Sequence, residues 1–146
     1  IRIVVDATKD LLMNVLKYHP FLIKPNNHEL GDMFGVQLET DEEIIEYAGK
    51  LKEMGARNVL ISMAGDGAIL ITEDGQNIKM GTPKGKVVNS VGAGDSMVAG
   101  FITGYIRGGN YEEALKSGTA AGSATAFSEG LASLEMYEKM LKQITE

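Results

Sequence analysis

The sequence contains no cysteine and no tryptophan, and it has only three prolines among its 146 residues. Without cysteine the chain can form neither disulfides nor thiolate metal sites, which fits a reducing, cytoplasmic setting. No apolar run approaches the roughly 18 residues that a membrane-spanning helix needs, so we expect no membrane partner. The net charge of −6 argues against non-specific binding to nucleic acid, although one local pocket could still hold a nucleotide.

The composition that remains is that of an ordinary folded domain, with 44% hydrophobic and 23% charged residues. A chain of this length buries roughly 68–70% of its extended surface, so we expect one domain over residues 1–146 with its own core. The first five residues already have the pattern of a buried strand. We therefore expect the chain to be a piece of a longer polypeptide.

Apolar patterning, capping residues and turn residues predict strands that alternate with helices. The expected strands cover residues 1–6, 21–24, 58–63, 68–72, 77–80 and 86–89, and the expected helices cover 7–18, 26–35, 40–54, 94–107, 110–127 and 133–144. Asp74 and Gly75 indicate a β-hairpin between two of the strands. This order predicts an α/β fold with a mostly parallel sheet and helices on both faces.

Residues 89–101, NSVGAGDSMVAGF, carry most of the chemical information. Gly92 and Gly94 let the backbone come close to a ligand, and the first N–H groups of the next helix are unpaired and favour an anion. A carboxylate beside a bound phosphate is repelled unless a cation shields it or it accepts a proton. The pattern thus indicates phosphoryl transfer to a hydroxyl, with Asp95 as base. The alternative is a helix start at which Asp95 only complements the helix dipole, worth about 0.3–1 kcal/mol.

Three other segments combine polar or small residues with a plausible place near a ligand. KPNNHE at 24–29 follows a predicted strand, where ligands bind in open α/β sheets, but Asn26 and Glu29 could equally be a helix-capping pair. SMAGDG at 62–67 has the composition of a turn between strands. The small residues of 118–124 indicate close packing against the helix that carries Gly100 and Gly104.

The glycine turn with its preceding strand and SMVAGF resembles the second signature of the ribokinase-like sugar kinases, the phosphofructokinase-B family. The resemblance extends over nearly the whole chain, as the carboxyl-terminal half of such a kinase. It implies a three-layer α/β/α fold in which the amides of Gly92, Ala93 and Gly94 form an anion hole and Asp95 is the catalytic base.

The resemblance also implies ATP and Mg²⁺ as cofactors. Asn26 and Glu29 match a motif that organises the magnesium of Mg-ATP, largely through water. Ala64 replaces a glycine of the family's ATP loop and would be strained at a positive φ. The full set of ATP-binding candidates is Lys24, Asn26, Ser62, Ala64, Gly65, Asp66, Gly67, Gly94, Gly122 and Ser123.

Within the family, Asn89-Ser90-Val91 and Ser96 are most similar to kinases of fructose 1-phosphate and of tagatose 6-phosphate. The expected partners are therefore ATP and a small sugar phosphate, for which we expect fructose 1-phosphate, with tagatose 6-phosphate as the alternative. A homodimer is a further expectation for the full-length protein. Because the family's sugar-binding residues lie mainly in its amino-terminal half, an ATP-binding piece without turnover is the second hypothesis. A non-enzymatic module with a purely structural turn is the third.

Overall fold

The computed structural model describes residues 2–130 and 132–145. The chain divides into two compact units. The first unit comprises Ile1–Met63 with Ile69–Lys79, and the second comprises Ala64–Ala68 with Met80–Glu146. None of the helices within the described ranges combines the length and the apolar character needed to cross a membrane.

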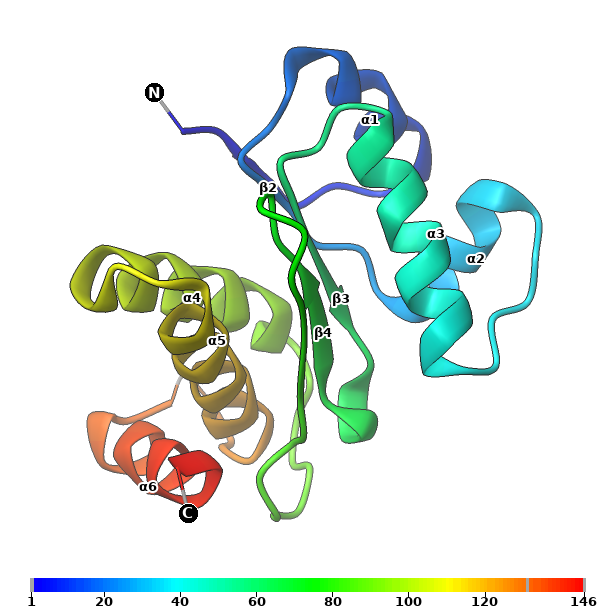
Figure 1. Ribbon diagram of the computed structural model, residues 1–146. Coiled ribbons are helices and arrows are strands. Elements are labelled where there is room, and N and C mark those ends of the chain that lie inside the picture. The colour runs from blue at the N-terminus through cyan, green and yellow to red at the C-terminus, as the bar shows by residue number, and fades with distance from the viewer. Residues whose placement is uncertain (1, 131, 146) are drawn as a thin grey trace. The chain divides into compact units, whose positions relative to one another are not determined.

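A five-stranded sheet runs in the order β1-β2-β3-β4-β5 (Figure 1). Its strands are β1 (Val4–Val5), β2 (Leu22–Ile23), β3 (Asn58–Ser62), β4 (Ala68–Ile71) and β5 (Asn77–Met80). β1 pairs with β2 and β2 pairs with β3 in parallel. β4 and β5 are neighbours joined by a short turn in which Gly75 has a φ of 88°, so the predicted hairpin is confirmed. The sheet is thus mixed, with its parallel part in β1–β3.

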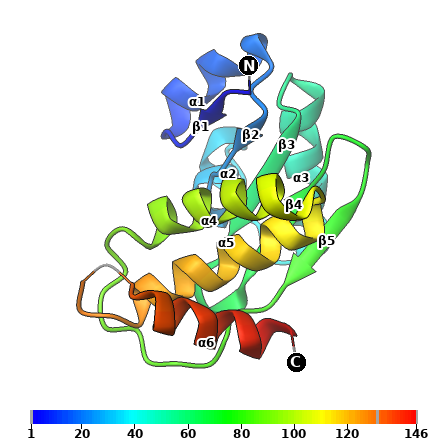
Figure 2. The same cartoon turned by 90° about the vertical axis from the view of Figure 1, so that its left-hand side faces the viewer.

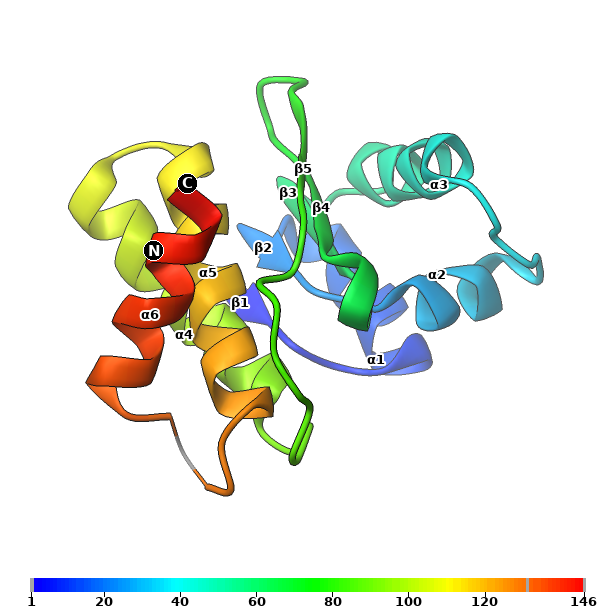
Figure 3. The same ribbon diagram turned by 90° about the horizontal axis from the view of Figure 1, so that it is seen from below.

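The helices of the first unit are α1 (Lys9–Val15), α2 (Asn27–Phe34) and α3 (Asp41–Glu53), with a 3-10 turn η1 (Leu16–Tyr18) after α1. They lie against one face of the sheet (Figures 1 and 3). The apolar core between helices and strands includes Leu12, Leu30, Leu51, Val59 and Ile61.

Local signals account for most helix boundaries in the first unit. Thr40 and Glu43 form the predicted capping box at the start of α3. The helix predicted for 7–18 instead divides into α1 and η1, and His19 ends it with a φ of 53°. Pro20 follows His19 and disfavours the right-handed helical conformation in the residue before it, which explains the break.

Three helices dominate the second unit, namely α4 (Ala93–Gly108), α5 (Tyr111–Ala126) and α6 (Leu134–Thr145), and a 3-10 turn η2 (Ala64–Asp66) also belongs to it. Figure 2 shows the three helices side by side. The predicted caps are present, because Asn110 Oδ1 accepts a hydrogen bond from Glu113 N–H, and Ser133 Oγ accepts one from Met136 N–H.

Glycines let α4 and α5 approach each other closely. A Cβ atom on Gly100 would lie 2.7 Å from Ser117 O, and one on Gly104 would lie 2.7 Å from Glu113 O. Both distances are too short for a real Cβ contact, so alanine is excluded at these positions without movement of the helices. The packing role predicted for the small residues is thus confirmed.

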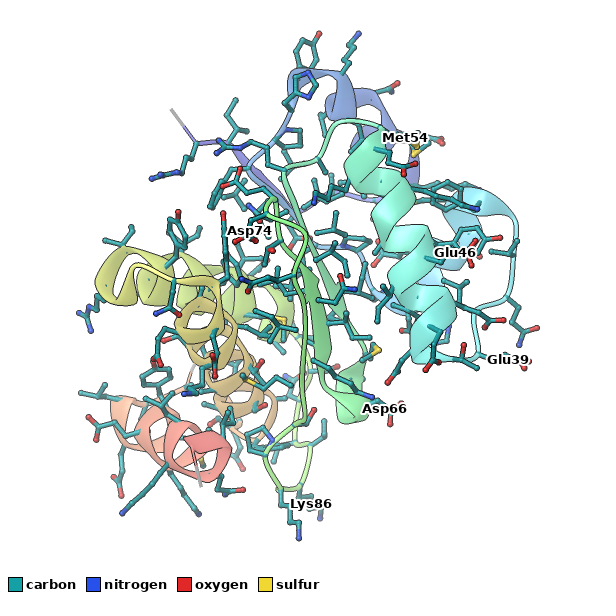
Figure 4. All side chains as sticks on the ribbon, in the orientation of Figure 1. Glu39, Glu46, Met54, Asp66, Asp74 and Lys86 are labelled. Atoms are coloured by element: carbon teal, nitrogen blue, oxygen red, sulfur yellow. The ribbon has the colours of Figure 1, made fainter. Side chains whose placement is uncertain are left out.

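The strand predicted at 86–89 is wrong. Residues 81–90 form an irregular connection, and Lys86 points outward from it (Figure 4). The N–H groups of Val88 and Asn89 donate to Ala126 O at the end of α5, at 2.8 and 3.1 Å. These amides therefore bind a helix terminus and not a neighbouring strand.

Candidate active site

The glycine turn leads directly into α4. Gly92 is the N-cap residue of α4 and has a φ of 82°, a conformation that glycine adopts without strain. Inside the turn Val91 N–H donates to Asn89 Oδ1 at 3.0 Å, and Ala93 N–H donates to Ser90 O at 3.1 Å. These local bonds define the backbone path through the turn.

The first turn of α4 presents unpaired donors beside a carboxylate. Among the described residues, the N–H groups of Gly92, Gly94 and Asp95 have no hydrogen-bond acceptor. Within the same ranges the Asp95 side chain is exposed and has neither an ion pair nor a hydrogen bond. Such a cluster of donors at a helix N-terminus can hold an anion, and a free carboxylate next to it can accept a proton. Ala93 N–H differs from the other three, because it donates within the turn.

The first unit carries the predicted magnesium motif at the carboxyl end of β2. Glu29 N–H donates to Asn26 Oδ1 at 2.8 Å, and Asn26 N–H donates to Glu29 Oε1 at 3.3 Å, which makes a capping box for α2. Asn26 also forms a parallel bridge with Ser62, and Ser62 N–H donates to Pro25 O at 3.2 Å. The fold thus brings together the motif and Ser62, the last residue of β3.

The donor set of this motif fits a magnesium ion that keeps most of its water. The capping box uses Asn26 Oδ1 and Glu29 Oε1, and it leaves Glu29 Oε2 without a protein donor in the described part of the chain. One amide and one carboxylate suffice when water supplies the other ligands of Mg²⁺. The described residues contain no group of three His, Cys, Asp or Glu side chains that could bind a metal directly. Magnesium binding by Asn26 and Glu29 therefore stays a prediction.

Lys24 lies just before this motif and is 91% buried, with 9% of its surface exposed. Its Nζ atom is 3.6 Å from Asp6 Oδ1, and the Asp6 side chain is 38% exposed. Burial of an ammonium group is costly without a counter-charge, so Asp6 stabilises Lys24 where it lies. Asp6 could not be predicted as the partner of Lys24, because nothing in the sequence around Asp6 points to Lys24.

The loop after β3 has two residues with positive φ, Ala64 at 47° and Gly67 at 93°. A Cβ atom on Gly67 would lie 2.0 Å from Met80 O, so this position requires glycine. Ala64 O accepts hydrogen bonds from Gly67 N–H at 3.1 Å and from Thr82 Oγ1 at 2.9 Å. The positive φ considered for Ala64 is thus present, and Ala64 adopts a conformation that L-residues rarely take.

Gly65 and Asp66 form the exposed tip of this loop, and Asp66 points away from the ribbon (Figure 4). Gly122 and Ser123 are buried on α5. A Cβ atom on Gly122 would lie 3.2 Å from Ala93 O, which gives Gly122 a packing role against the first turn of α4. Contacts of these four residues with ATP remain predictions.

The predicted site residues are divided between the units. Lys24, Asn26, Glu29 and Ser62 belong to the first unit, whereas residues 64–67, 92–95, 122 and 123 belong to the second. The structure groups Asn26, Glu29 and Ser62 in the first unit. In the second unit the structure joins the glycine turn to the end of α5, a contact that could not be predicted from the sequence.

The chain is thus an α/β protein in which a glycine turn and an adjacent carboxylate at the start of α4 form a candidate anion site. The pfkB family of carbohydrate kinases matches residues 2–136. The chain belongs to this family.

Individual relatives agree with this assignment. The chain is 48% identical over 143 residues to 1-phosphofructokinase of Bacillus subtilis, covering 98% of this chain and 47% of the relative. It is 40% identical over 145 residues to D-tagatose-1-phosphate kinase of Bacillus licheniformis, covering 99% and 47%. The chain thus spans about half the length of the curated relatives it matches.

Solved structures support the same fold. A candidate phosphofructokinase from Staphylococcus aureus superposes with a TM-score of 0.93 at 46% identity, over 97% of this chain and 46% of that one. Ribokinase of Arabidopsis thaliana superposes with a TM-score of 0.80 at 25% identity, over 97% and 48%. The expected ribokinase-like fold is confirmed.

Proposed function

We propose that the full-length protein transfers the terminal phosphoryl group of ATP to a hydroxyl of fructose 1-phosphate, forming fructose 1,6-bisphosphate. The proposal is supported by the N–H groups of Gly92, Gly94 and Asp95 at the start of α4 and the exposed carboxylate of Asp95 next to them, which have no partner among residues 2–130 and 132–145. The choice of fructose 1-phosphate is supported by the 48% identity to a 1-phosphofructokinase.

In the proposed reaction Asp95 accepts the proton of the sugar hydroxyl while the hydroxyl oxygen attacks the γ-phosphorus. The new bond joins this oxygen to the phosphorus, the bond from the phosphorus to the bridging oxygen of ADP breaks, and ADP leaves with the electron pair. General-base catalysis of this kind contributes typically about 10²–10⁴-fold. The N–H groups of Gly92 and Gly94 stabilise the charge that develops on the phosphoryl oxygens, whereas Ala93 N–H is engaged with Ser90 O.

The first unit contributes charge and orientation. Asn26 and Glu29 would hold the hydrated magnesium ion of Mg-ATP, and the bound ion would supply positive charge that offsets the negative charge of the phosphates. The ammonium group of Lys24 adds a positive charge at the same end of β2, held in place by Asp6. The loop of Ser62 and residues 64–67, together with Gly122 and Ser123, contacts the nucleotide.

A second substrate class follows from a specific comparison. The relative from Bacillus licheniformis is a D-tagatose-1-phosphate kinase at 40% identity, and the residues around the glycine turn also resemble kinases of tagatose 6-phosphate. A side-by-side assay of fructose 1-phosphate, tagatose 1-phosphate and tagatose 6-phosphate separates these substrates. The highest kcat/KM with either tagatose phosphate would contradict fructose 1-phosphate.

The second candidate function is ATP binding without turnover by this chain alone, because the chain spans 47% of its first relatives. Calorimetric titration with Mg-ATP, followed by a phosphotransfer assay on the same sample, tests it. Binding without product supports this function for the chain by itself, and turnover excludes it. Absence of nucleotide binding would favour a purely structural role for the glycine turn.

We also propose that the full-length protein is cytoplasmic and forms a homodimer. Analytical ultracentrifugation of the full-length protein tests the homodimer.

A further inference from the structure

The last turn of α5 holds the segment that carries the proposed anion hole. Ala126 O accepts hydrogen bonds from the N–H groups of Val88 and Asn89, at 2.8 and 3.1 Å. The Thr125 hydroxyl is hydrogen-bonded to the Ser96 hydroxyl, with 2.7 Å between the two oxygens. The glycine turn is therefore tied to α5 on both sides, by the backbone before the turn and by a side chain after it.

The hydroxyl pair lies one residue from the proposed base. Ser96 follows Asp95 directly and belongs to the first turn of α4, where its N–H group donates to Gly92 O at 3.0 Å. Thr125 is only 2% exposed, so water has little access to compete for its hydroxyl. A rotation of the first turn of α4 would break this bond and would turn Asp95 at the same time.

Burial on α5 does not by itself supply such a bond. Thr119 lies on the same helix and is 1% exposed, yet its hydroxyl has no hydrogen-bond partner among the described residues. Thr125 differs from Thr119 because its hydroxyl meets a polar side chain on α4. This difference makes Thr125 a specific connection between the two helices.

We propose that Thr125 is a positioning residue for phosphoryl transfer. Its hydroxyl orients Ser96, and through Ser96 it sets the direction of the Asp95 carboxylate and of the N–H groups at the start of α4. The inference rests on the proposed function, because it assigns a purpose to the same glycine turn. A misplacement of about 1 Å can cost roughly a hundredfold in rate, so a bond that fixes this turn matters for turnover.

The kinetic test compares Thr125→Val, Thr125→Ser and Ser96→Ala with wild type in the complete kinase. We expect Thr125→Val and Ser96→Ala each to lower kcat by about tenfold or more, with the KM for ATP nearly unchanged. Thr125→Ser keeps a hydroxyl and retains turnover. Thr103→Val is the matched control, because Thr103 is exposed on α4 and its hydroxyl donates to Ala99 O of its own helix. Wild-type kcat in Thr125→Val, or equal losses in the Val and Ser variants, would overturn the inference.

A second measurement separates this inference from the proposed function. The amide ¹H–¹⁵N resonances of Gly94 and Asp95 in this chain report the orientation of the turn without any turnover. We expect Thr125→Val to move both resonances and Thr125→Ser to leave them near their wild-type positions. Ser96→Ala gives the same test if Thr125→Val does not fold.

Unmoved resonances in a folded Thr125→Val or Ser96→Ala variant would overturn the inference, whatever the activity of the enzyme. If the resonances move while the wild-type kinase transfers no phosphoryl group to any sugar phosphate, the proposed function fails and the control of the turn by Thr125 stands. The two failures therefore give different results.

Discussion

Gly122 on α5 lies so close to Ala93 on α4 that a Cβ atom added to Gly122 would be 3.2 Å from the Ala93 carbonyl oxygen. This distance is shorter than nine in ten real Cβ contacts, so alanine at position 122 must displace its neighbour by a few tenths of an ångström. The neighbour is the backbone of the proposed anion hole. We therefore expect Gly122→Ala to lower kcat of the complete kinase by about tenfold, since catalysis depends on sub-ångström positioning.

Gly49→Ala is the control for this prediction. Gly49 lies within α3 and has open space around the position of a Cβ atom. Alanine there should raise the free energy of unfolding by about 0.8–1 kcal/mol through helix propensity, with no effect on kcat. Equal kcat values for Gly122→Ala and wild type, measured on folded protein, would contradict the proposed placement of the anion hole.

Asp95→Asn in the complete kinase tests the proposed base directly. An amide has almost no basicity at neutral pH, so we expect kcat to fall about a hundredfold or more. Binding of Mg-ATP, measured by calorimetric titration, should persist because the backbone donors of the turn remain. Turnover close to wild type would refute the role of Asp95. Asp10→Asn is the matched control, since Asp10 is exposed on α1 and lies outside the candidate site.

Ala64→Gly should stabilise the chain. Ala64 has a φ of 47°, and an L-residue in this left-handed region costs about 1–2 kcal/mol relative to the right-handed one. Glycine removes that cost but increases the entropy of the unfolded chain by about 0.4–1 kcal/mol, so the net gain is about 0.5–1 kcal/mol. Urea denaturation measures it. Ala99→Gly, at an exposed position within α4, should instead destabilise by about 1 kcal/mol, and a loss of stability in both variants would contradict strain at Ala64.

Glu43 should make the folded chain less stable as the pH falls. Its carboxylate accepts hydrogen bonds from the N–H groups of Glu39 and Thr40, and these bonds lower the pKa of Glu43 below its ordinary value. A carboxyl group with a lowered pKa in the folded state contributes stability that is fully present above its unfolded pKa. That contribution is lost as the pH falls through the folded pKa.

We therefore expect Glu43→Gln to be less stable than wild type at pH 7, with the difference shrinking as the pH falls below about 4. Thermal unfolding from pH 3 to pH 7 measures this. Glu42→Gln is the control, because it removes a charge from the same turn without removing a capping bond. A difference between Glu43→Gln and wild type that stays constant over the whole pH range would count against the capping role.

Thr119→Val should stabilise the second unit. The Thr119 hydroxyl is buried without a hydrogen-bond partner in the described part of the chain, and an unpaired buried polar group costs about 1–3 kcal/mol. Valine has the same shape without the hydroxyl, so we expect the free energy of unfolding to rise by about 1 kcal/mol or more. The same substitution at Thr125 breaks the hydrogen bond to Ser96 and should lower the free energy of unfolding. Destabilisation by Thr119→Val would show that its hydroxyl has a partner in solution.

Local chemistry made much of the fold predictable. The capping boxes at Thr40 and Asn26 and the hairpin at Asp74-Gly75 each depend on residues a few positions apart, and the structure confirms them. The local sequence pattern gave a wrong prediction at residues 86–89. This strand-like segment forms no strand, and the N–H groups of Val88 and Asn89 donate to the end of α5. The partner of those amides lies far along the chain, so no local pattern could reveal it.

The candidate site shows the same division. The glycine turn, the position of Asp95 at the start of a helix and the pairing of Asn26 with Glu29 were determined by the sequence alone, because turn and capping chemistry act over a few residues. Only the tertiary structure decided that Thr125 meets Ser96 across a separation of 29 residues. That contact exists because glycines on both helices let α4 and α5 pack closely enough for two short hydroxyl side chains to touch.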